Sequence, residues 1–328
     1  SPLKANPFGI IKLNKGKAGI VSTLYAVYKV KEKNAYGPFL DYYFSLDANT
    51  NRYLRPLVKK GAKNDMKINN AYVLHDRIFA PTTDEQKRIA TFFTVLEKKI
   101  AVLKQKKNLL EQYKKGVMQK LFSQELRFND KNGEEYPKWV EKKFGEEIQD
   151  SGYGPRFNGE DYSSEGNVKT IRGTDISVDG EILYSQVPLA KLDPNFIKNH
   201  LLEDGDLVMI TTADCGLTGV FRNQSIAYIP SAYTVKIKLK NSSNPYFFKY
   251  FFQTKIAINQ VNKYIRKATV SNLPGSDILR FSINIPSLAE QTKIANFLSD
   301  IEEKLNRTEI QIQQTQEYKK GLLQKMYC

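Results

Sequence analysis

The apolar residues of two stretches of the chain recur at alternating steps of four and three. This period of 3.5 residues is typical of the seam between two helices of a coiled coil. We therefore predict two long helices, residues 82–123 and 287–328, that pack against each other in antiparallel orientation. Their seam positions are Ile89, Phe93, Leu96, Ile100, Leu103, Leu110, Val117 and Leu121 in the first helix, and Ile294, Leu298, Ile301, Leu305, Ile312, Leu322 and Met326 in the second.

Polar residues interrupt this seam at five positions. A polar residue inside a coiled-coil seam can specify how the two helices align, at some cost in stability. We interpret the interruptions as determinants of the helix register. They are Lys107, Lys114, Thr308, Thr315 and Lys319.

The second helical stretch repeats the first at a constant offset of 205 positions. Each copy begins with a proline and a Ser/Thr-x-x-Glu capping box, which satisfies free backbone N–H groups at a helix start. Two unrelated helices in separate bundles would share neither the caps nor the offset, so we predict an internal repeat with approximate twofold symmetry. The matching residues include Glu85 with Glu290, Gln86 with Gln291, Ile89 with Ile294, Phe92 with Phe297, Glu97 with Glu302, Tyr113 with Tyr318 and Gly116 with Gly321.

Mixed strand and helix patterns fill the two segments that precede these helices, residues 1–81 and 124–286. In the second segment, glycine-punctuated β stretches lie at residues 168–176, 206–212 and 232–239, and a helical stretch follows at 245–265. In the first, residues 20–30 predict a strand, residues 39–46 and 53–58 predict short helices, and residues 59–64 predict a basic turn. The expected fold class is α+β, with two mixed globular domains and two long helices.

The first segment is shorter than the second. Tyr25-Ala26-Val27 resembles Tyr233-Thr234-Val235 at an offset of 208 positions, which leaves roughly residues 126–207 without a counterpart. The chain also starts without methionine and runs at once into a strand-like stretch. We therefore expect residues 1–81 to be a globular domain whose N-terminal part is missing.

Composition favours a polyanionic partner. The 328 residues are 41% hydrophobic, enough for packed cores, and 50 Lys and Arg against 35 Asp and Glu give a net charge of +15. No apolar run reaches the roughly twenty residues of a membrane span and no secretory signal opens the chain, so the cytoplasm is the expected compartment. Two distant cysteines, Cys215 and Cys328, and two histidines, His75 and His200, provide neither a disulfide framework nor a zinc spacing.

Catalytic motifs are incomplete. Asn244-Pro245-Tyr246-Phe247 is similar to the loop with which adenine methyltransferases hold a flipped base, but it lacks the second proline and a glycine-rich cofactor loop, and a helix start explains it. Lys15-Gly16-Lys17 lacks the upstream glycine and the Ser/Thr of a phosphate loop. Glu85-Gln86-Lys87 is similar to a nuclease Glu-x-Lys, yet Glu85 is already assigned to a helix cap. We expect no catalytic residue, no cofactor and no metal on this chain.

Loops that combine basic and small polar residues are the candidate DNA contacts. Lys and Arg beside glycine or small residues can approach phosphates, while Arg, Thr, Ser, Asn and Tyr can reach base edges in the major groove. Any single one of them is better explained as a solvated charge or a structural hydroxyl, so the prediction concerns the groups. The candidates are Lys12, Lys15, Lys17, Ser22, Thr23, Tyr25, Lys59, Lys60, Lys63 and Asn64 in the first domain, and Arg156, Lys169, Arg172, Thr174, Thr211, Thr212, Arg222, Tyr233, Arg266, Lys267, Thr269 and Ser271 in the second.

Three sets of strings carry a resemblance to a known family. They are EQKRIATFF with YKKGVMQKLF, EQTKIANFL with YKKGLLQKMY, and ELRFNDKNGEEYPKWVEKKFGEEI, which opens the second domain. With them the chain resembles the specificity subunit of type I restriction–modification systems, in which each of two target-recognition domains is followed by such a helical region. The motif that opens the first domain in this family does not precede it here, which agrees with the expectation that the N-terminal part of this domain is missing.

The resemblance implies a division of labour among subunits. Each recognition domain would read one half of a bipartite, asymmetric site in double-stranded DNA, and the paired helices would set the spacer and dock two methyltransferase subunits. Restriction subunits would join this assembly. S-adenosylmethionine, ATP and Mg²⁺ would bind to the partner subunits, and this chain would be non-catalytic.

Two alternatives from other classes remain at this point. A coiled-coil scaffold that links two protein-binding modules would explain the helices but not the net charge of +15. A fused methyltransferase or nuclease is disfavoured by the incomplete motifs. An electrophoretic shift on duplex DNA separates the first alternative from a DNA-recognition subunit, and the activity of the purified chain separates the second.

Overall fold

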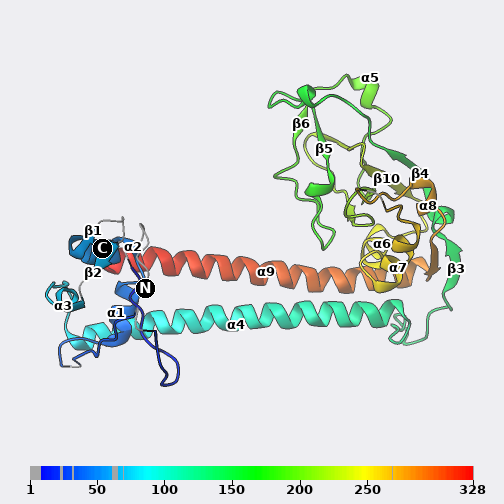
Figure 1. Ribbon diagram of the computed structural model, residues 1–328. Helices are drawn as coiled ribbons and strands as arrows, with labels where there is room; N and C mark the ends of the chain where they lie inside the picture. Colours follow the sequence, from blue (N-terminus) through cyan, green and yellow to red (C-terminus); the bar gives the residue numbers. More distant parts are fainter. Residues whose placement is uncertain are drawn as a thin grey trace. The chain divides into compact units, whose positions relative to one another are not determined.

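Two helices of 40 residues each, α4 (Thr83–Phe122) and α9 (Leu288–Tyr327), are the longest elements of the computed structural model (Figure 1). The structure describes residues 9–22, 25–31, 33–60, 66–68, 70–267 and 269–327. Both helices begin where the caps predict, because the hydroxyls of Thr82 and Ser287 accept the backbone N–H of Glu85 and Glu290 at 3.4 Å. The chain forms two compact units, unit 1 (Ser1–Leu109 with Leu305–Cys328) and unit 2 (Leu110–Lys304).

Unit 1 packs short helices against the first part of α4 and the last part of α9. Its buried core combines aromatic residues of α1 with side chains of both long helices; the core residues are Phe39, Tyr42, Tyr43, Ala90, Phe93, Leu323 and Tyr327. The remaining elements are α1 (Gly37–Tyr43), α2 (Asp47–Leu54), η1 (Arg55–Leu57), the antiparallel strands β1 (Val58–Lys60) and β2 (Met66–Ile68), and α3 (Asn70–Val73).

The strand predicted for residues 20–30 is wrong. Of this stretch, the described residues 20–22 and 25–30 form no strand. Val21, Tyr25 and Val27 are exposed, by 53%, 52% and 78%. Alternation of β-branched and aromatic residues produces a strand only where a neighbouring strand and a buried face are available, and here these side chains face solvent.

Unit 2 mixes strands and short helices, which confirms the α+β class. A four-stranded sheet has the order β4-β10-β7-β8, a three-stranded sheet the order β6-β5-β9, and β11 pairs with β3. The elements are β3 (Val140–Lys143), η2 (Phe144–Glu147), β4 (Ile148–Tyr153), η3 (Gly159–Asp161), β5 (Val168–Ile171), η4 (Gly173–Asp175), β6 (Leu189–Ala190), α5 (Pro194–Ile197), β7 (Leu207–Ile210), β8 (Thr218–Val220), β9 (Ala227–Pro230), β10 (Thr234–Leu239), α6 (Pro245–Phe251), α7 (Lys255–Tyr264), α8 (Gly275–Ile278) and β11 (Ser282–Ile285).

Two predicted segments of unit 2 are divided. The stretch 168–176 is a strand only as far as Ile171 and then turns into η4. The helical stretch 245–265 is two helices, because the Thr254 hydroxyl accepts the backbone N–H of Ala257 at 3.2 Å and starts α7. Within the described ranges, no helical segment combines the length and the hydropathy that spanning a lipid bilayer requires.

The two long helices pair in unit 1 in antiparallel orientation. Nζ of Lys319 lies 2.7 Å from Glu97, and Nζ of Lys107 lies 2.8 Å from Glu309. From the first pair to the second, the residue number rises by ten along α4 and falls by ten along α9. In unit 2, Nζ of Lys114 lies 2.5 Å from Glu302. Each lysine that interrupts the predicted seam thus faces a glutamate of the other helix, which agrees with a role in register.

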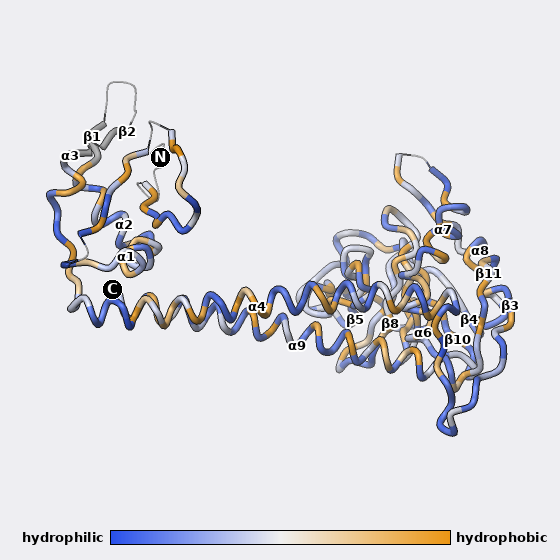
Figure 2. The backbone as a smooth tube through the Cα atoms, turned by 90° about the horizontal axis from the view of Figure 1, so that it is seen from below, coloured by the Kyte–Doolittle hydropathy of each residue, from blue (hydrophilic) through white to orange (hydrophobic). Residues whose placement is uncertain are grey.

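Most of the predicted seam is buried, and one position of it is wrong. Figure 2 shows apolar residues recurring along α4 and α9 with polar residues between them. Ile294, Leu298 and Ile312 are at most 4% exposed, but Met326 is 43% exposed, and the adjacent Tyr327 is buried in its place. The buried aromatic ring of Tyr327 stacks near Phe39 of α1 with ring centroids 5.0 Å apart, which explains why the pattern shifts by one residue at this end.

The repeat extends from the long helices to the short helices packed on them. In unit 1, Nε2 of Gln86 donates to the Pro81 carbonyl at 2.8 Å, and its Oε1 accepts the N–H of Tyr36 at 2.9 Å. In unit 2, Gln291 makes the equivalent bonds to the Pro286 carbonyl at 3.0 Å and to the N–H of Asn244 at 2.8 Å. Tyr36 and Asn244 are the residues before α1 and α6, so the same amide fixes the start of both helices.

Candidate nucleic-acid interface

Four loops of unit 2 are tied together by backbone hydrogen bonds at one end of the four-stranded sheet. The N–H of Thr211 donates to the Tyr233 carbonyl at 3.1 Å, and that of Ala213 donates to the Ser271 carbonyl at 2.9 Å. The N–H of Gly154 donates to the Ser231 carbonyl at 3.2 Å. We call these loops the loop cluster; they are residues 152–156, residues 211–215, residues 231–233, and the described parts of a fourth loop, 266–267 and 269–272.

The loop cluster brings together side chains that the sequence singled out. Arg156, Arg266, Lys267, Thr269 and Tyr233 are all exposed, Tyr233 by 62%. Guanidinium and ammonium groups can contact phosphates, and the tyrosine and threonine hydroxyls can reach base edges. The arrangement therefore provides both kinds of contact that a DNA-reading surface needs.

Two backbone positions hold the loop cluster in shape. A Cβ on Gly154 would lie 1.8 Å from the Pro230 carbonyl oxygen, so only glycine permits this approach of two loops. Ala213 has a φ of 66°, in the left-handed region that alanine rarely adopts. Such strain persists only where the surrounding structure enforces it, and it gathers at functional sites.

Three other predicted residues contribute less exposed groups to the same loops. Thr211 is 1% exposed, and its hydroxyl donates to the Tyr233 carbonyl at 2.9 Å, so it positions that loop. Thr212 and Ser271 are half-buried. Their direct contact with DNA stays a prediction.

A second group of predicted residues, Lys169 of β5 and Arg222, lies around Tyr184. Lys169 donates to the Tyr184 carbonyl at 3.2 Å, and the backbone N–H of Arg222 donates to the Tyr184 hydroxyl at 2.8 Å. Burial raises the pKa of Tyr184 to about 12, so this hydroxyl stays protonated. The Arg222 guanidinium lies 4.9 Å from the centre of the Tyr246 ring, and its side chain remains exposed.

Arg172 is held by one acidic partner. Its Nε and one terminal nitrogen each donate to Asp175 at 3.0 Å, and this pairing raises the pKa of the guanidinium. Asp175 is fully buried. The neighbouring Thr174 is exposed. The ion pair with Asp175 therefore holds Arg172 at the surface, close in sequence to the exposed Thr174.

The predicted residues of unit 1 are placed only in part. Lys12, Lys17, Ser22 and Tyr25 are exposed. Lys15 is exposed as well, but its Nζ lies 2.7 Å from Asp41. Lys59 and Lys60 lie in β1, whereas three predicted contacts fall outside the described residues; these are Thr23, Lys63 and Asn64.

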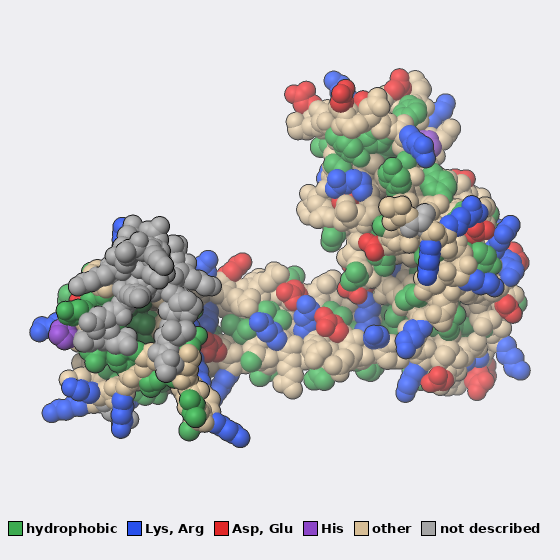
Figure 3. Space-filling model, in the orientation of Figure 1, with side chains coloured by type: hydrophobic (Ala, Val, Ile, Leu, Met, Phe, Trp, Pro, Cys, Tyr) green, Lys and Arg blue, Asp and Glu red, His purple; other side chains and the backbone are tan. Residues whose placement is uncertain are grey.

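On the face that Figure 3 draws, the described basic side chains do not form one continuous patch. On the face that Figure 3 draws, Lys and Arg side chains are scattered over both units and are interspersed with acidic ones in unit 2. On that face, local groups such as the loop cluster are therefore the candidates for contact with DNA.

The catalytic candidates have structural roles. Oδ1 of Asn244 accepts the backbone N–H of Tyr246 and Phe247 at 3.0 and 3.3 Å, so this residue caps α6 as the simpler interpretation predicts. Sγ of Cys215 donates to the Thr211 carbonyl at 3.1 Å, and burial raises the pKa of its thiol. Within the described ranges, no cluster of three or more His, Cys, Asp or Glu is arranged to hold a metal.

Sequence reasoning missed two buried polar contacts, both within unit 2, that attach its globular part to the start of α9. Arg127 donates through Nε and a terminal nitrogen to Glu290 at 3.2 and 2.9 Å, and also to the carbonyls of Tyr136 and Pro137. Lys249, 2% exposed, contacts Glu302 of α9 at 2.9 Å. The signal for Arg127 was its place in the string that opens the second domain. The signal for Lys249 was a single charge inside an aromatic run.

Comparison with protein families identifies one family for this chain. A family model described as the type I restriction modification DNA specificity domain matches residues 137–315, which is more than half of the chain. A structure that describes complex assembly and conformational transition of the type I R-M system is similar, with a TM-score of 0.56 and 18% identity over 93% of this chain and 74% of the other.

Two further solved structures have the same fold. The HsdS subunit from Thermoanaerobacter tengcongensis matches with a TM-score of 0.50 and 17% identity over 91% of this chain and 72% of its own. The type I restriction-modification S subunit from M. genitalium matches with a TM-score of 0.55 and 14% identity over 91% and 74%. At these identities the structures show a shared fold.

Proposed function

The chain belongs to the type I restriction modification DNA specificity family, and from this premise we propose that it is the DNA-sequence-recognition subunit of a type I restriction–modification enzyme. The observation that carries the proposal is the loop cluster, whose hydrogen-bonded loops carry exposed Arg156, Arg266 and Lys267 together with Tyr233 and Thr269 inside the region matched by the family model. The net charge of +15 supports a polyanionic ligand. Specificity subunits of this family are non-catalytic, so the chemistry would belong to partners.

We further propose that each globular domain reads one half of a bipartite DNA site. The long helices repeat residue by residue, whereas the loops of units 1 and 2 differ in sequence and in contacts. A repeated scaffold with two different reading surfaces supports two different half-sites.

Exchange of one domain tests this assignment. Replacing residues 138–286 with the corresponding segment of a relative is expected to change one half of the methylated sequence and to leave the other half unchanged. Sequencing of methylated adenines in cells that carry the partner subunits measures both halves at once. A reciprocal exchange, which returns the original segment to the chimera, is the control. A change in both halves, or in neither, would contradict the assignment.

Two repeat-related tyrosines on the long helices support docking of two copies of one partner, which we propose to be the methyltransferase subunit. Tyr113 of α4 and Tyr318 of α9 are related by the repeat, and their side chains are 54% and 57% exposed. On the N-terminal side of Tyr113, α4 carries three more exposed apolar residues, Leu109, Val102 and Val95. An exposed apolar stripe on a helix is typical of a protein-binding surface.

Single alanine substitutions test the docking sites separately. Y113A and Y318A are each expected to weaken one of the two sites by about 2 kcal/mol, which is roughly 30-fold, because a central tyrosine often dominates an interface. Native mass spectrometry should then report one methyltransferase subunit per chain for each single variant and none for the double variant at limiting concentration. Y136A, a half-buried tyrosine of the linker, is the control. Loss of both subunits in a single variant would contradict two independent sites.

We propose that the helix pair sets the spacer between the half-sites. A seven-residue insertion between Lys107 and Lys114, matched by one between Glu302 and Glu309, lengthens the pair by about 10 Å and keeps every described ion pair between the helices. The spacer should lengthen by about three base pairs, at roughly 3.4 Å each, while the half-sites stay the same. An insertion in α4 alone breaks the register and should abolish methylation. An unchanged spacer in an active, doubly extended variant would rule out this role.

S-adenosylmethionine, ATP and Mg²⁺ are proposed to bind the methyltransferase and restriction subunits of the assembly, which would work on cytoplasmic DNA. Titration calorimetry of the purified chain with each of the three is expected to give no heat of binding. Saturable binding of any of them to the chain alone would contradict this division.

A further inference from the structure

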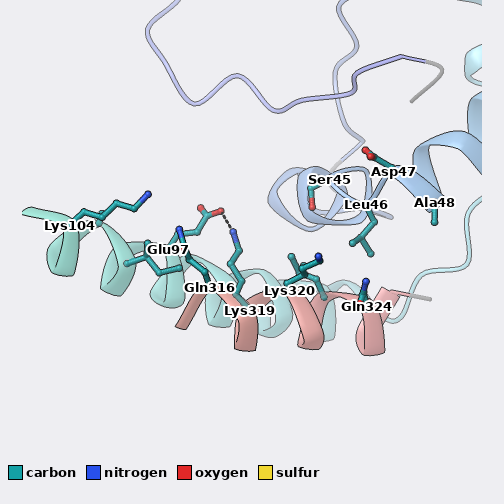
Figure 4. Close-up of a pocket in the computed structure, with 13 residues that line it drawn as sticks. Ser45, Leu46, Asp47, Ala48, Glu97, Lys104, Gln316, Lys319, Lys320 and Gln324 are labelled. Atoms are coloured by element: carbon teal, nitrogen blue, oxygen red, sulfur yellow. Dashed lines mark hydrogen bonds and ion pairs between the residues drawn. The ribbon is translucent and has the colours of Figure 1, made fainter. Parts of the chain in front are cut away.

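Four charged side chains form an alternating row in unit 1. Lys319 of α9 lies 2.7 Å from Glu97 of α4, a pair that Figure 4 shows beside the loop at Ser45. Lys15 lies 3.9 Å from the same Glu97 and 2.7 Å from Asp41 of α1. The order is therefore lysine, glutamate, lysine, acid. Asp41 is 7% exposed, so the acid at the end of the row is buried.

Unit 2 contains the same row built from different residues. Lys114 of α4 lies 2.5 Å from Glu302 of α9, and Lys249 of α6 lies 2.9 Å from Glu302. Lys249 also pairs with Glu181, from the turn at residues 177–181. The order is again lysine, glutamate, lysine, acid. Burial alone would lower the pKa of Lys249, but Glu302 and Glu181 raise it, so the lysine stays charged.

The two rows differ in their last two charges. In unit 1 the lysine lies on a loop and the acid on a short helix, whereas in unit 2 the lysine lies on a short helix and the acid on a loop. The repeat relates Glu97 to Glu302 and Lys319 to Lys114, at the offset of 205. Tyr42 and Tyr250 correspond at the offset of 208, since their hydroxyls lie 3.3 and 3.0 Å from the repeat-related Thr94 and Ser299. The preceding residues, Asp41 and Lys249, therefore occupy equivalent positions with opposite charges.

In each unit, a charged residue of the loop neutralises the charge of the short-helix residue, which has opposite signs in the two units. Lys15 pairs with Asp41 and is 55% exposed, whereas Glu181 pairs with Lys249 and is 48% exposed. The helix residue is buried in both cases, at 7% and 2% exposed. A buried charge whose partner has the wrong sign is strongly destabilising, because it is removed from water without compensation.

We propose that the inverted charges at Asp41 and Lys249 determine which loop docks on which helix pair, so that the surface of unit 1 accepts a cationic segment and that of unit 2 an anionic one. A duplicated scaffold offers each loop two similar surfaces, in its own chain and in other copies. Opposite charges reject the wrong combination, which is the repulsive part of specificity. The inference does not depend on the proposed function.

Charge reversals in the full chain test the pairing. K15E, D41K, E181K and K249D are each expected to accelerate amide hydrogen exchange of the docked segment, residues 10–16 or 177–182, by about tenfold or more. The double variants K15E/D41K and E181K/K249D restore the attraction between the loop residue and the helix residue, but they place the new acid beside Glu97 or Glu302. They should therefore exchange more slowly than the faster of their single variants without reaching the wild-type rate. The control is E203K/K238E, the reversal of an exposed pair at 2.6 Å, which should change neither segment. Double variants that exchange as fast as their faster single variant would overturn the proposal.

Variants in which positions 41 and 249 carry the same charge test whether this charge selects the loop that docks. K15E/D41K alone puts a buried lysine in both units, E181K/K249D alone puts a buried acid in both, and the quadruple variant keeps the two units opposite. K15E/D41K and E181K/K249D are refolded from urea at the same concentration as wild type. Both are expected to form more dimers in which a loop docks on another copy of the chain, as measured by size exclusion with light scattering. The quadruple variant should form no more than wild type. Equal dimer fractions in all variants, or a raised fraction in the quadruple variant, would overturn the proposal.

Discussion

Replacing Glu302 with glutamine is expected to lower the free energy of unfolding of unit 2 by about 3 kcal/mol. The Glu302 side chain is 12% exposed and contacts Lys114, Lys249 and the Tyr250 hydroxyl. Glutamine preserves the shape but leaves Lys249 with a single, half-exposed acidic partner. The repeat supplies the matched comparison, because Glu97 is 40% exposed, and E97Q should cost unit 1 only about 1 kcal/mol.

Urea denaturation monitored by hydrogen exchange resolves the two units and measures both changes. Burial alone would raise the pKa of Glu302, but Lys249 and Lys114 hold it below its ordinary value. The charge therefore stabilises the fold above the ordinary glutamate pKa of about 4.3, and this contribution is lost as pH falls through the lower folded pKa. The difference between wild type and E302Q should shrink in acid. Equal costs of E302Q and E97Q would contradict the assignment of a buried ionic centre to unit 2.

The second large effect is expected on DNA affinity. The triple variant R156A/R266A/K267A removes three positive charges from the loop cluster, all on exposed side chains. If each contacts one phosphate, the slope of log affinity against log salt should fall by about 2.7, since each contact contributes roughly 0.9. At low salt, the affinity of the complex with its partner subunits should drop by about 100-fold or more.

A variant of equal charge separates local contacts from the overall charge. K131A/K138A/K240A also removes three exposed lysines from unit 2, but outside the loop cluster. Fluorescence anisotropy across a salt series should show a nearly unchanged slope for this control. Equal losses in both triple variants would mean that net charge, rather than the loop cluster, determines binding.

The long helices were predictable almost to the residue, because their start and phase are encoded locally. Thr82 and Ser287 mark the caps, and the 3.5-residue period continues for about ten turns. The strand expected at residues 20–30 failed for the opposite reason. Its alternation of Tyr25 and Val27 is local, but a strand requires a neighbour elsewhere in the chain, and no local signal reports whether that neighbour exists.

The loop cluster and the charge rows were predictable only as lists of residue types. Arg156, Tyr233 and Arg266 come from three loops, and their proximity depends on backbone hydrogen bonds between those loops. Lys249 pairs with Glu181 and Glu302, which are 68 and 53 positions away. A single sequence does not contain that pairing, since any of its 35 acidic residues would serve equally well in the absence of a fold.

The uncharged amides at Gln86 and Gln291 have a consequence for ionic conditions. Each is 1% exposed and joins a long helix to the residue that precedes a short helix, without using an ion pair. At 0.1 M salt the Debye length is about 10 Å, so interactions between exposed charges are weakened by screening. A buried hydrogen bond between neutral groups is nearly unaffected. A salt concentration that releases DNA from the loop cluster should therefore leave α1 and α6 fixed on their helices, so that dissociation from the DNA does not require the protein to come apart.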